Sequence, residues 1–137
     1  MQKTLTILKP DTVAAANVGA VLAVIEKEGL KVRAMKMLRL SQAEAEGFYH
    51  VHKARPFFGS LVAFMTEGPI VAAVLEGDDA VQRLRKVMGA TDPAKADAGT
   101  IRKLYATNIE RNAIHGSDGP DTAAIEISYL FSQLEIV

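Results

Sequence analysis

The amino-acid sequence predicts an α/β protein of the α+β type, a ferredoxin-like sandwich in which helices flank a four-stranded antiparallel sheet. Two observations support this fold class. Short apolar runs bounded by glycine and proline alternate with segments of helical periodicity, which is typical of strands that alternate with helices. With 137 residues, the chain is too short for a full doubly wound sheet but long enough for one ordinary core. We therefore expect a single domain over residues 1–137, with the helices on one face of the sheet.

The first strand is predicted over Lys3–Leu8, a short run of β-branched and apolar residues. It stops before Pro10, which cannot donate a hydrogen bond to a sheet, so Lys9 is expected at a strand end. A helix follows, with Asn17 able to cap it and Gly29 at its end. Its apolar residues recur with the helical period: Val18, Val21, Leu22 and Ile25.

A second, half-exposed strand is predicted over residues 30–40, where charged and apolar residues alternate. Ser41 and Glu44 then have the spacing of a capping box, which opens a helix. Pro56 interrupts that helix, and residues 57–65 are expected to continue helically.

A continuous apolar run over residues 70–75, bounded by turn residues on both sides, predicts a buried central strand. Asp78 or Asp79 can cap the next helix, which ends at Gly89. From Gly89 to about Glu110 the helical pattern disappears. A loop of this length in a compact domain is usually functional or disordered, and we favour a functional loop.

A short fourth strand is predicted at residues 113–115, before a last helix that Asp118 or Asp121 can start. The inward residues of this helix are expected to be Ala124, Ile127, Leu130 and Phe131. The predicted order is therefore strand, helix, strand, two helices, strand, helix, strand and helix.

Sixteen basic and sixteen acidic residues leave the chain without net charge. Nucleic acid is an unlikely partner for such a protein, because nonspecific binding to it depends on an excess of lysine and arginine. No apolar stretch approaches the roughly 18 residues of a membrane-spanning helix, and the first apolar run is too short for a signal peptide. The chain has no cysteine, which excludes disulfides and thiolate metal sites and suits a cytoplasmic location.

His115 is the first candidate for chemistry, since it lies between a short apolar run and a Gly-Ser-Asp turn. Neutral imidazole is nucleophilic near pH 7 when its second nitrogen is held by a hydrogen bond. Glu126, about three helical turns further along the chain, is the natural partner for that nitrogen. On spacing alone, a lone histidine beside a turn is more often structural, and Glu126 can equally be an ordinary solvated glutamate.

Phosphoryl transfer needs positive charge around the transferred group. The chain contains neither a GxxxxGK[ST] nor a GxGxxG motif, so the charge must come from separated side chains. Four residues could converge on a phosphate, although each taken singly is more simply a surface residue: the cationic Lys9, Arg85 and Arg102, and the hydroxyl of Thr91. His50 and His52 are two residues apart, which places them on different sides of a helix and argues against zinc. Likewise, the methionines at positions 35 and 37 are interpreted as sheet packing.

Nearly the whole chain, from Thr4 to about Ile136, resembles the nucleoside diphosphate kinase family. The resemblance rests on five motifs, which are very specific when taken together. They are Lys9-Pro10-Asp11, Arg55-Pro56-Phe57-Phe58, Gly89-Ala90-Thr91, Gly99-Thr100-Ile101-Arg102, and the segment from Asn112 to Asp118.

This resemblance implies a ping-pong reaction centred on His115, which takes the terminal phosphate of ATP or another nucleoside triphosphate and passes it to a nucleoside diphosphate. It also implies that Arg85, Thr91 and Arg102 hold the phosphates. Glu126 is expected behind the histidine.

The remaining roles follow from the same resemblance. Lys9 and Asn112 are expected to bind sugar hydroxyls, and Lys9 also to reach the transferred group. Tyr49 and Ser117 are expected to form hydrogen bonds near the nucleophile. Phe57 is expected to stack on the base, and since every base has a π face, broad base specificity follows.

The chain departs from the family pattern at three places, which concern metal, phosphate and the packing of the long loop. Val51 stands where many relatives have an acidic residue, so Mg²⁺ is expected to arrive on the nucleotide phosphates rather than on protein ligands. Asp92, in place of a common asparagine, is expected to put a negative charge near the phosphates and weaken binding modestly. Leu104 and Tyr105 are expected to affect the packing of the long loop.

A non-catalytic nucleotide-binding or assembly module of the same fold is the alternative, and the intact set of His115, Lys9, Arg102 and Asn112 argues against it. The resemblance further implies a homo-oligomer, a tetramer or hexamer built from dimers. The apolar C-terminal residues 134–137 suggest a tail that packs on a neighbour.

Overall fold

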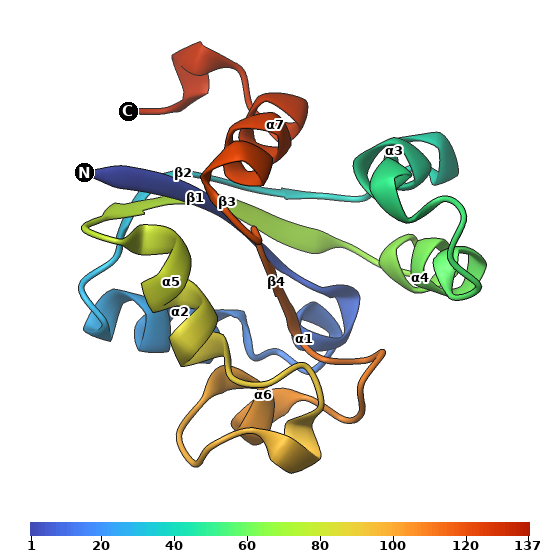
Figure 1. The fold of residues 1–137 in the computed structure, drawn as a ribbon, viewed down its shortest axis with the longest axis horizontal. Coiled ribbons are helices and arrows are strands. Elements are labelled where there is room, and N and C mark those ends of the chain that lie inside the picture. The colour runs from blue at the N-terminus through green and yellow to red at the C-terminus, as the bar shows by residue number, and fades with distance from the viewer.

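The computed structural model describes all of residues 1–137, and its centre is a four-stranded antiparallel sheet in the order β2-β3-β1-β4 (Figure 1). The strands are β1 (Gln2–Leu8), β2 (Lys31–Leu38), β3 (Ile70–Gly77) and β4 (Ile114–Gly116). All three neighbouring pairs are antiparallel, with a register shift in β2 between Val32 and Ala34. The predicted ferredoxin-like class, with a four-stranded antiparallel sheet, is confirmed.

Seven α-helices connect and cover these strands. They are α1 (Pro10–Ala14), α2 (Val18–Lys27), α3 (Gln42–Phe48), α4 (Phe58–Met65), α5 (Ala80–Met88), α6 (Ile101–Tyr105) and α7 (Pro120–Leu130). Three single turns of 3₁₀ helix add to them: η1 (His50–His52), η2 (Pro93–Lys95) and η3 (Gln133–Glu135). In Figure 1, α3 and α4 project beyond one end of the sheet, and α6 lies below β4.

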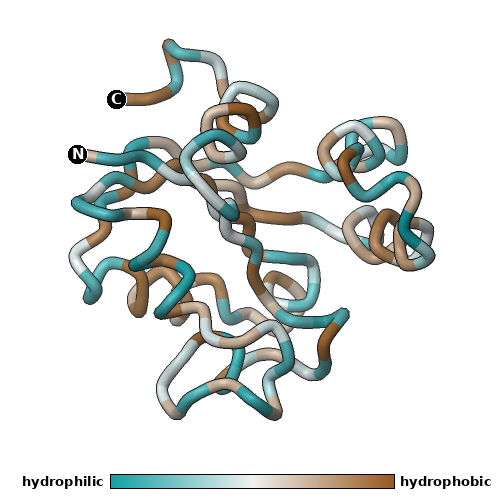
Figure 2. Tube along the Cα trace, in the orientation of Figure 1, coloured by the Kyte–Doolittle hydropathy of each residue, from teal (hydrophilic) through white to brown (hydrophobic).

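Helices cover both faces of the sheet, not one face as expected. Alternate residues of β3 belong to two separate apolar clusters, Ile70, Ala72 and Val74 in one and Val71, Ala73 and Leu75 in the other. The first cluster packs against α3, α4 and α7, and the second against α2, α5 and α6. Figure 2 shows the hydrophobic strand segments between these layers. A strand that is apolar on both sides needs cover on both sides, which the run at residues 70–75 already required.

The helix starts agree with the predictions only in part. Ser41 and Glu44 form the predicted capping box, with the Ser41 amide 2.8 Å from the Glu44 carboxylate. Asp79 occupies the position before α5, but its side chain caps nothing. Gly119 rather than Asp118 or Asp121 precedes α7. Ala123, not Ala124, faces the core from α7.

The segment after Gly89 is more ordered than the predicted loop, because it contains η2 and α6. Thr100 caps α6 by accepting a hydrogen bond from the Lys103 amide, and Ile101 is completely buried. Each element here is about one turn long, too short to display a helical period in the sequence. The five-residue helix α1 was missed for the same reason.

Strand β2 forms an outer edge of the sheet and is partly covered by the C-terminal segment. The Val137 amide donates to the Arg33 carbonyl oxygen at 3.0 Å. Met35 and Met37 are 53% and 60% exposed, so their interpretation as packed sheet residues is wrong. None of the helices has the length and apolar character needed to cross a membrane.

Candidate active site

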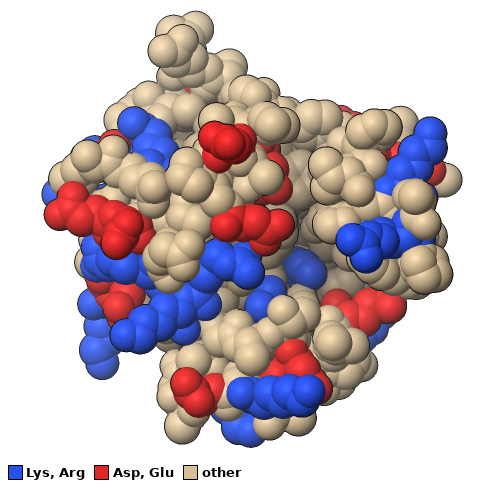
Figure 3. Space-filling model, in the orientation of Figure 1, with Lys and Arg blue, Asp and Glu red and all other residues tan.

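A cleft of about 420 Å³ opens between the α3–α4 region, the end of β1 and the loop that precedes β4. Its walls come from segments far apart in the sequence: Lys9, Tyr49, His52, Phe57, Leu61, Thr91, Ile109, Glu110, Asn112 and His115. Figure 3 shows a hollow with lysine and arginine atoms at its floor. The cleft is therefore apolar on one wall and cationic at depth.

His115 lies on β4, and its side chain is only 18% exposed. Its Nε2 is 2.8 Å from Oε1 of Glu126 on α7, and the Ser117 hydroxyl donates to the same oxygen at 2.7 Å. Burial alone would raise the pKa of Glu126, but the hydrogen bond and charge of His115, with the bond from Ser117, bring that pKa below its usual value. An ionised Glu126 can only accept a hydrogen bond, so Nε2 carries the proton and the lone pair of neutral His115 is on Nδ1.

Two aromatic rings limit the rotation of the imidazole. Phe48 and Tyr49 meet it edge-on, with ring centroids 5.4 and 6.2 Å away. Tyr49 is buried, and burial followed by the negative charge of Glu126 raises the pKa of its phenol. Its hydroxyl has no hydrogen-bond partner within the protein. It remains protonated at neutral pH, and its donor is not used by any protein atom.

Gly116 is the last residue of β4, and there is no room for a side chain at this position. A Cβ there would lie 2.5 Å from Sδ of Met88 and 3.0 Å from Cδ2 of Leu84 on α5. The glycine of the His-Gly-Ser-Asp motif thus allows β4 to pack directly on α5.

Lys9 follows the end of β1 and is buried at the floor of the cleft. Its Nζ donates to Oδ1 of Asn112 at 2.8 Å. Burial, together with the positive charge of Arg102, lowers the pKa of Lys9 to about 8, although the charges of Asp11 and Glu110 oppose the change. The amine is therefore mostly protonated at pH 7 and loses that charge under mildly alkaline conditions.

Arg102 binds backbone atoms rather than lining the cleft. Its Nε, Nη1 and Nη2 donate to the carbonyl oxygens of Asn112, Gly89 and Ile114 at 3.3, 3.2 and 2.9 Å. Burial and the nearby charge of Arg85 lower the pKa of Arg102, which nevertheless stays cationic at neutral pH. The guanidinium on α6 thus holds both Gly89, which follows α5, and residues 112–114 in place beside the cleft.

Arg85 also lies outside the cleft wall, on α5. It forms a half-exposed ion pair with Asp118 at 3.0 Å and approaches the Gly116 carbonyl oxygen at 3.5 Å. Because Arg85 affects the pKa of Arg102, and Arg102 that of Lys9, the three positive charges are close neighbours.

The structure brings most of the predicted site residues to one place. Six of them line the cleft: Lys9, Tyr49, Phe57, Thr91, Asn112 and His115. Ser117 and Glu126 lie behind the histidine, while Arg85 and Arg102 lie beside the cleft.

Four cleft residues were missed by the sequence analysis: His52, Leu61, Ile109 and Glu110. Leu61 is four residues after Phe57, so helical spacing could have identified it. Ile109 is a single apolar residue in a polar stretch and 61% exposed, which is a weaker signal. Nothing in the sequence pattern distinguishes Glu110. His52 stacks on Tyr49 with ring centroids 6.5 Å apart.

The adjacent phenylalanines have different environments. Phe57 is 45% exposed and faces the cleft, whereas Phe58 packs against the core. One ring is thus available to a ligand and the other holds α4 on the sheet.

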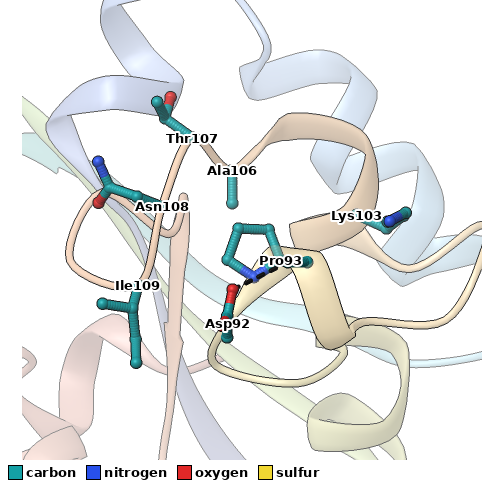
Figure 4. Close-up of a pocket in the computed structure, with 8 residues that line it drawn as sticks. Asp92, Pro93, Lys103, Ala106, Thr107, Asn108 and Ile109 are labelled. Carbon is teal, nitrogen blue, oxygen red and sulfur yellow. Dashed lines mark hydrogen bonds between the residues drawn. The ribbon is translucent and has the colours of Figure 1, made fainter.

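The Asp92 carboxylate does not enter the cleft. It accepts a hydrogen bond from the Ala94 amide at 3.0 Å. Figure 4 shows it in a separate hollow, together with Pro93, Ala106 and Ile109. The expected weakening of phosphate binding therefore has no geometric support.

The other two departures are also placed by the structure. Val51 is 82% exposed, and no cluster of three metal-binding side chains exists in the protein. Leu104 is 53% exposed, and Tyr105 packs against the second apolar cluster.

The fold and the cationic cleft fit an enzyme of the phosphotransferase class, and comparison with known proteins shows the family. The chain matches the family profile described as nucleoside diphosphate kinase over residues 2–136. It is 62% identical to a nucleoside diphosphate kinase of Anaeromyxobacter sp. strain Fw109-5 over 135 residues, which are 98% of this chain and 92% of that protein. It is 59% identical to a nucleoside diphosphate kinase of Bradyrhizobium diazoefficiens over 137 residues, with 100% and 98% covered.

Solved structures agree with this similarity. The Aquifex aeolicus nucleoside diphosphate kinase superimposes with a TM-score of 0.97 at 45% identity, covering 99% of both chains. The halophilic nucleoside diphosphate kinase from Halobacterium salinarum, solved in complex with CDP, gives 0.95 at 39% identity, covering 99% of this chain and 91% of that one. The chain belongs to the nucleoside diphosphate kinase family.

Proposed function

We propose that this protein moves the terminal phosphate of a nucleoside triphosphate to a nucleoside diphosphate through a phosphate held on His115. The observation that carries the proposal is the bond of Nε2 to Glu126, which leaves Nδ1 as the nucleophile beside the cleft. The Nδ1 lone pair forms a bond to phosphorus while the bond to the oxygen of the departing diphosphate breaks. In the second half-reaction a diphosphate oxygen attacks the same phosphorus, and the bond to nitrogen breaks.

The phosphates are assigned to the cationic end of the cleft. Protonated Lys9 and the unpartnered hydroxyl of Tyr49 can donate to the transferred group, and Thr91 to the neighbouring phosphates. Arg85 can turn from its exposed partner Asp118 toward a phosphate at little cost. Arg102 contributes mainly its positive charge, since its donors are already bound to carbonyl oxygens.

The nucleoside is assigned to the apolar end. Phe57 offers an exposed ring, with Leu61 and Ile109 also lining that part of the cleft. Stacking of this kind accepts every base, so ATP, GTP and the other nucleotides are proposed substrates. Lys9 and Asn112, already joined at 2.8 Å, can meet the sugar hydroxyls.

Mg²⁺ is proposed to reach the site on the nucleotide. The protein has no cluster of three carboxylate or imidazole ligands, whereas phosphate oxygens and water satisfy this ion. When bound there, it neutralises part of the phosphate charge.

The direct test of this function is a labelling experiment. Wild-type protein mixed with Mg-ATP labelled on its terminal phosphate should yield an acid-labile phosphoprotein, which unlabelled GDP then discharges as labelled GTP. A wild-type protein that binds nucleotide but takes up no label would refute the enzyme and leave the non-catalytic binding module.

Removing the carboxylate of Glu126 should slow the reaction far more than it weakens binding. In the Glu126→Ala variant the proton of His115 has no fixed acceptor, so both tautomers form and the ring loses its orientation. We expect kcat to fall by about 10- to 100-fold, with KM for the nucleotide changed little. Ser128→Ala, an exposed hydroxyl on the same helix, serves as the control and should retain full activity. Equal losses in kcat for the two variants would contradict the assigned role.

The pH dependence of kcat/KM should follow the ionisation of the Lys9 amine. As pH rises through about 8, the pKa to which burial lowers the amine, Lys9 loses its charge and kcat/KM should fall. Bound phosphates favour the charged amine, so the alkaline limb of kcat should lie at higher pH than that of kcat/KM. Glu110→Gln removes a charge that raises this pKa, and should move the kcat/KM limb to lower pH. A profile that stays flat to pH 10 would show that Lys9 charge is not required.

Assembly and location complete the proposal. We take residues 1–137 as one domain that works in the cytoplasm and assembles from dimers into a tetramer or hexamer. The exposed Met35 and Met37 on the edge strand β2, and the exposed Leu134, support an interface there. Light scattering of the pure protein should give a multiple of the 14.7 kDa chain mass.

A further inference from the structure

The backbone is strained two residues before His115. Ala113 has φ = +74°, a region that alanine rarely adopts, and it is fully buried. The Ile114 amide donates to the Asn112 carbonyl oxygen at 2.9 Å across it. A hydrogen bond between residues i and i+2 around a positive φ is the rare, strained form of the γ-turn. Such a turn persists only where its surroundings hold it.

Both polar backbone groups of Ala113 are held by the start of α1, about a hundred residues earlier in the chain. Its amide donates to Oδ2 of Asp11 at 3.0 Å. Its carbonyl oxygen accepts from the Lys9 amide at 2.9 Å and from the Thr12 hydroxyl at 2.8 Å. Of the three partners, only Asp11 bonds to the Ala113 amide, and it does so through its side chain.

The strained turn separates two residues with different tasks in the cleft. Asn112, before the turn, accepts from the Lys9 amine. His115, after the turn, pairs with Ile7 in the sheet and faces Glu126. If Ala113 relaxed to a negative φ, Asn112 and His115 could no longer both keep these contacts, because the chain direction between them would change.

We propose that Asp11 is a positioning residue, whose carboxylate holds Ala113 in the strained turn and thereby fixes His115 and Asn112 relative to each other. This inference rests on the proposed phosphohistidine reaction. Asp11 itself does not line the cleft, so its effect on the reaction passes through the turn.

The second carboxylate oxygen of Asp11 has a separate effect. Oδ1 is buried without a hydrogen-bond partner. The charge of Asp11 raises the pKa of Lys9 against the effects of burial and Arg102. Asp11 therefore favours the protonated form of the lysine while its other oxygen holds the turn, and the two effects can be separated by substitution.

Four variants test the inference in a rapid-quench measurement of phosphoprotein formation. Asp11→Ala loses the bond to the Ala113 amide, and we expect the rate to fall by about 10- to 100-fold, as for a misplaced reacting group. Adding Ala113→Gly should restore the rate to within about threefold of wild type, because glycine adopts a positive φ without strain. Ala113→Gly alone should react at nearly the wild-type rate.

Asp11→Asn separates the bond from the charge. Its amide oxygen can still accept from the Ala113 amide, so the rate at pH 7 should stay close to wild type. The alkaline limb of kcat/KM should move to lower pH, because the negative charge beside Lys9 is gone. A role in stability alone would move neither this limb nor the rate of a folded variant.

The matched control is Asp121→Ala, an exposed aspartate in the first turn of α7 that should leave the rate unchanged. The inference is overturned if Asp11→Ala reacts at the wild-type rate, or if Ala113→Gly fails to rescue it. Should Asp11→Ala not fold, a slow Asp11→Asn at pH 7 overturns it equally. Failure of the proposed function is distinct, since wild-type protein would then take up no label.

Discussion

Replacing His115 with alanine should abolish the acid-labile phosphoprotein and lower the rate of phosphate transfer by about 10⁴-fold or more. The variant lacks the Nδ1 lone pair, and no other nucleophile has an equivalent acceptor such as Glu126 behind it. Nucleotide binding should remain measurable, because Phe57 and Lys9 are untouched. Two measurements on one preparation test this. Incubation with labelled ATP measures the acid-labile phosphoprotein, and calorimetry measures the nucleotide affinity.

The other two histidines supply the comparison. His50 is exposed and does not line the cleft, so His50→Ala should take up label as wild type does. His52 lines the cleft beside Phe57, and its alanine variant should bind nucleotide less tightly but still become labelled. Label on His115→Ala would move the nucleophile elsewhere, with His52 as the next imidazole in the cleft.

The largest effect on stability is expected at Arg102. Arg102→Ala removes three hydrogen bonds to the carbonyl oxygens of Gly89, Asn112 and Ile114. The Asn112 oxygen still accepts from the Ile114 amide, so the loss falls mainly on the oxygens of Gly89 and Ile114. We expect the free energy of unfolding to fall by about 2 to 4 kcal/mol, as for loss of a charged donor from buried acceptors. The midpoint of urea unfolding measures this change.

Arg85→Ala is the natural contrast, because it also removes a cationic donor beside the cleft. Its ion pair with Asp118 is exposed, so its loss should cost less than about 1 kcal/mol. Arg102→Lys keeps the charge but cannot reach three carbonyl oxygens with one ammonium group, and should fall between the two. If Arg102→Ala and Arg85→Ala unfold at the same urea concentration, the structural role of Arg102 is wrong.

The sequence predicted the elements that carry a clear period and missed those that do not. The apolar run at residues 70–75 and the Ser41–Glu44 capping box both have local signals, and both are found as predicted. Helices α1 and α6 have five residues each, which is less than the window in which a hydrophobic period can be recognised. The run at residues 70–75 is apolar on both faces of its strand and so already indicates two covering layers, but the local pattern does not show which helices form them.

Some features of the site could likewise be predicted from the sequence and others could not. His115 and Lys9 stand in recognisable motifs, and the structure places both in the cleft. The position of Glu126 could be proposed from spacing on α7, and it lies within 2.8 Å of the histidine. The bonds of Arg102 to carbonyl oxygens could not be foreseen, because only the folded chain brings residues 89, 112 and 114 around one guanidinium.

The contacts between the start of α1 and the residues before β4 also bear on how the protein folds. Lys9 meets Asn112 across 103 positions of sequence, and Thr12 meets Ala113 across 101. Contacts this distant carry a large loop-closure entropy and tend to form slowly. Strand β4 has only three residues with which to offset that cost. Recovery of nucleotide binding should therefore mark the end of refolding, after the helices and the β2-β3 pair have formed.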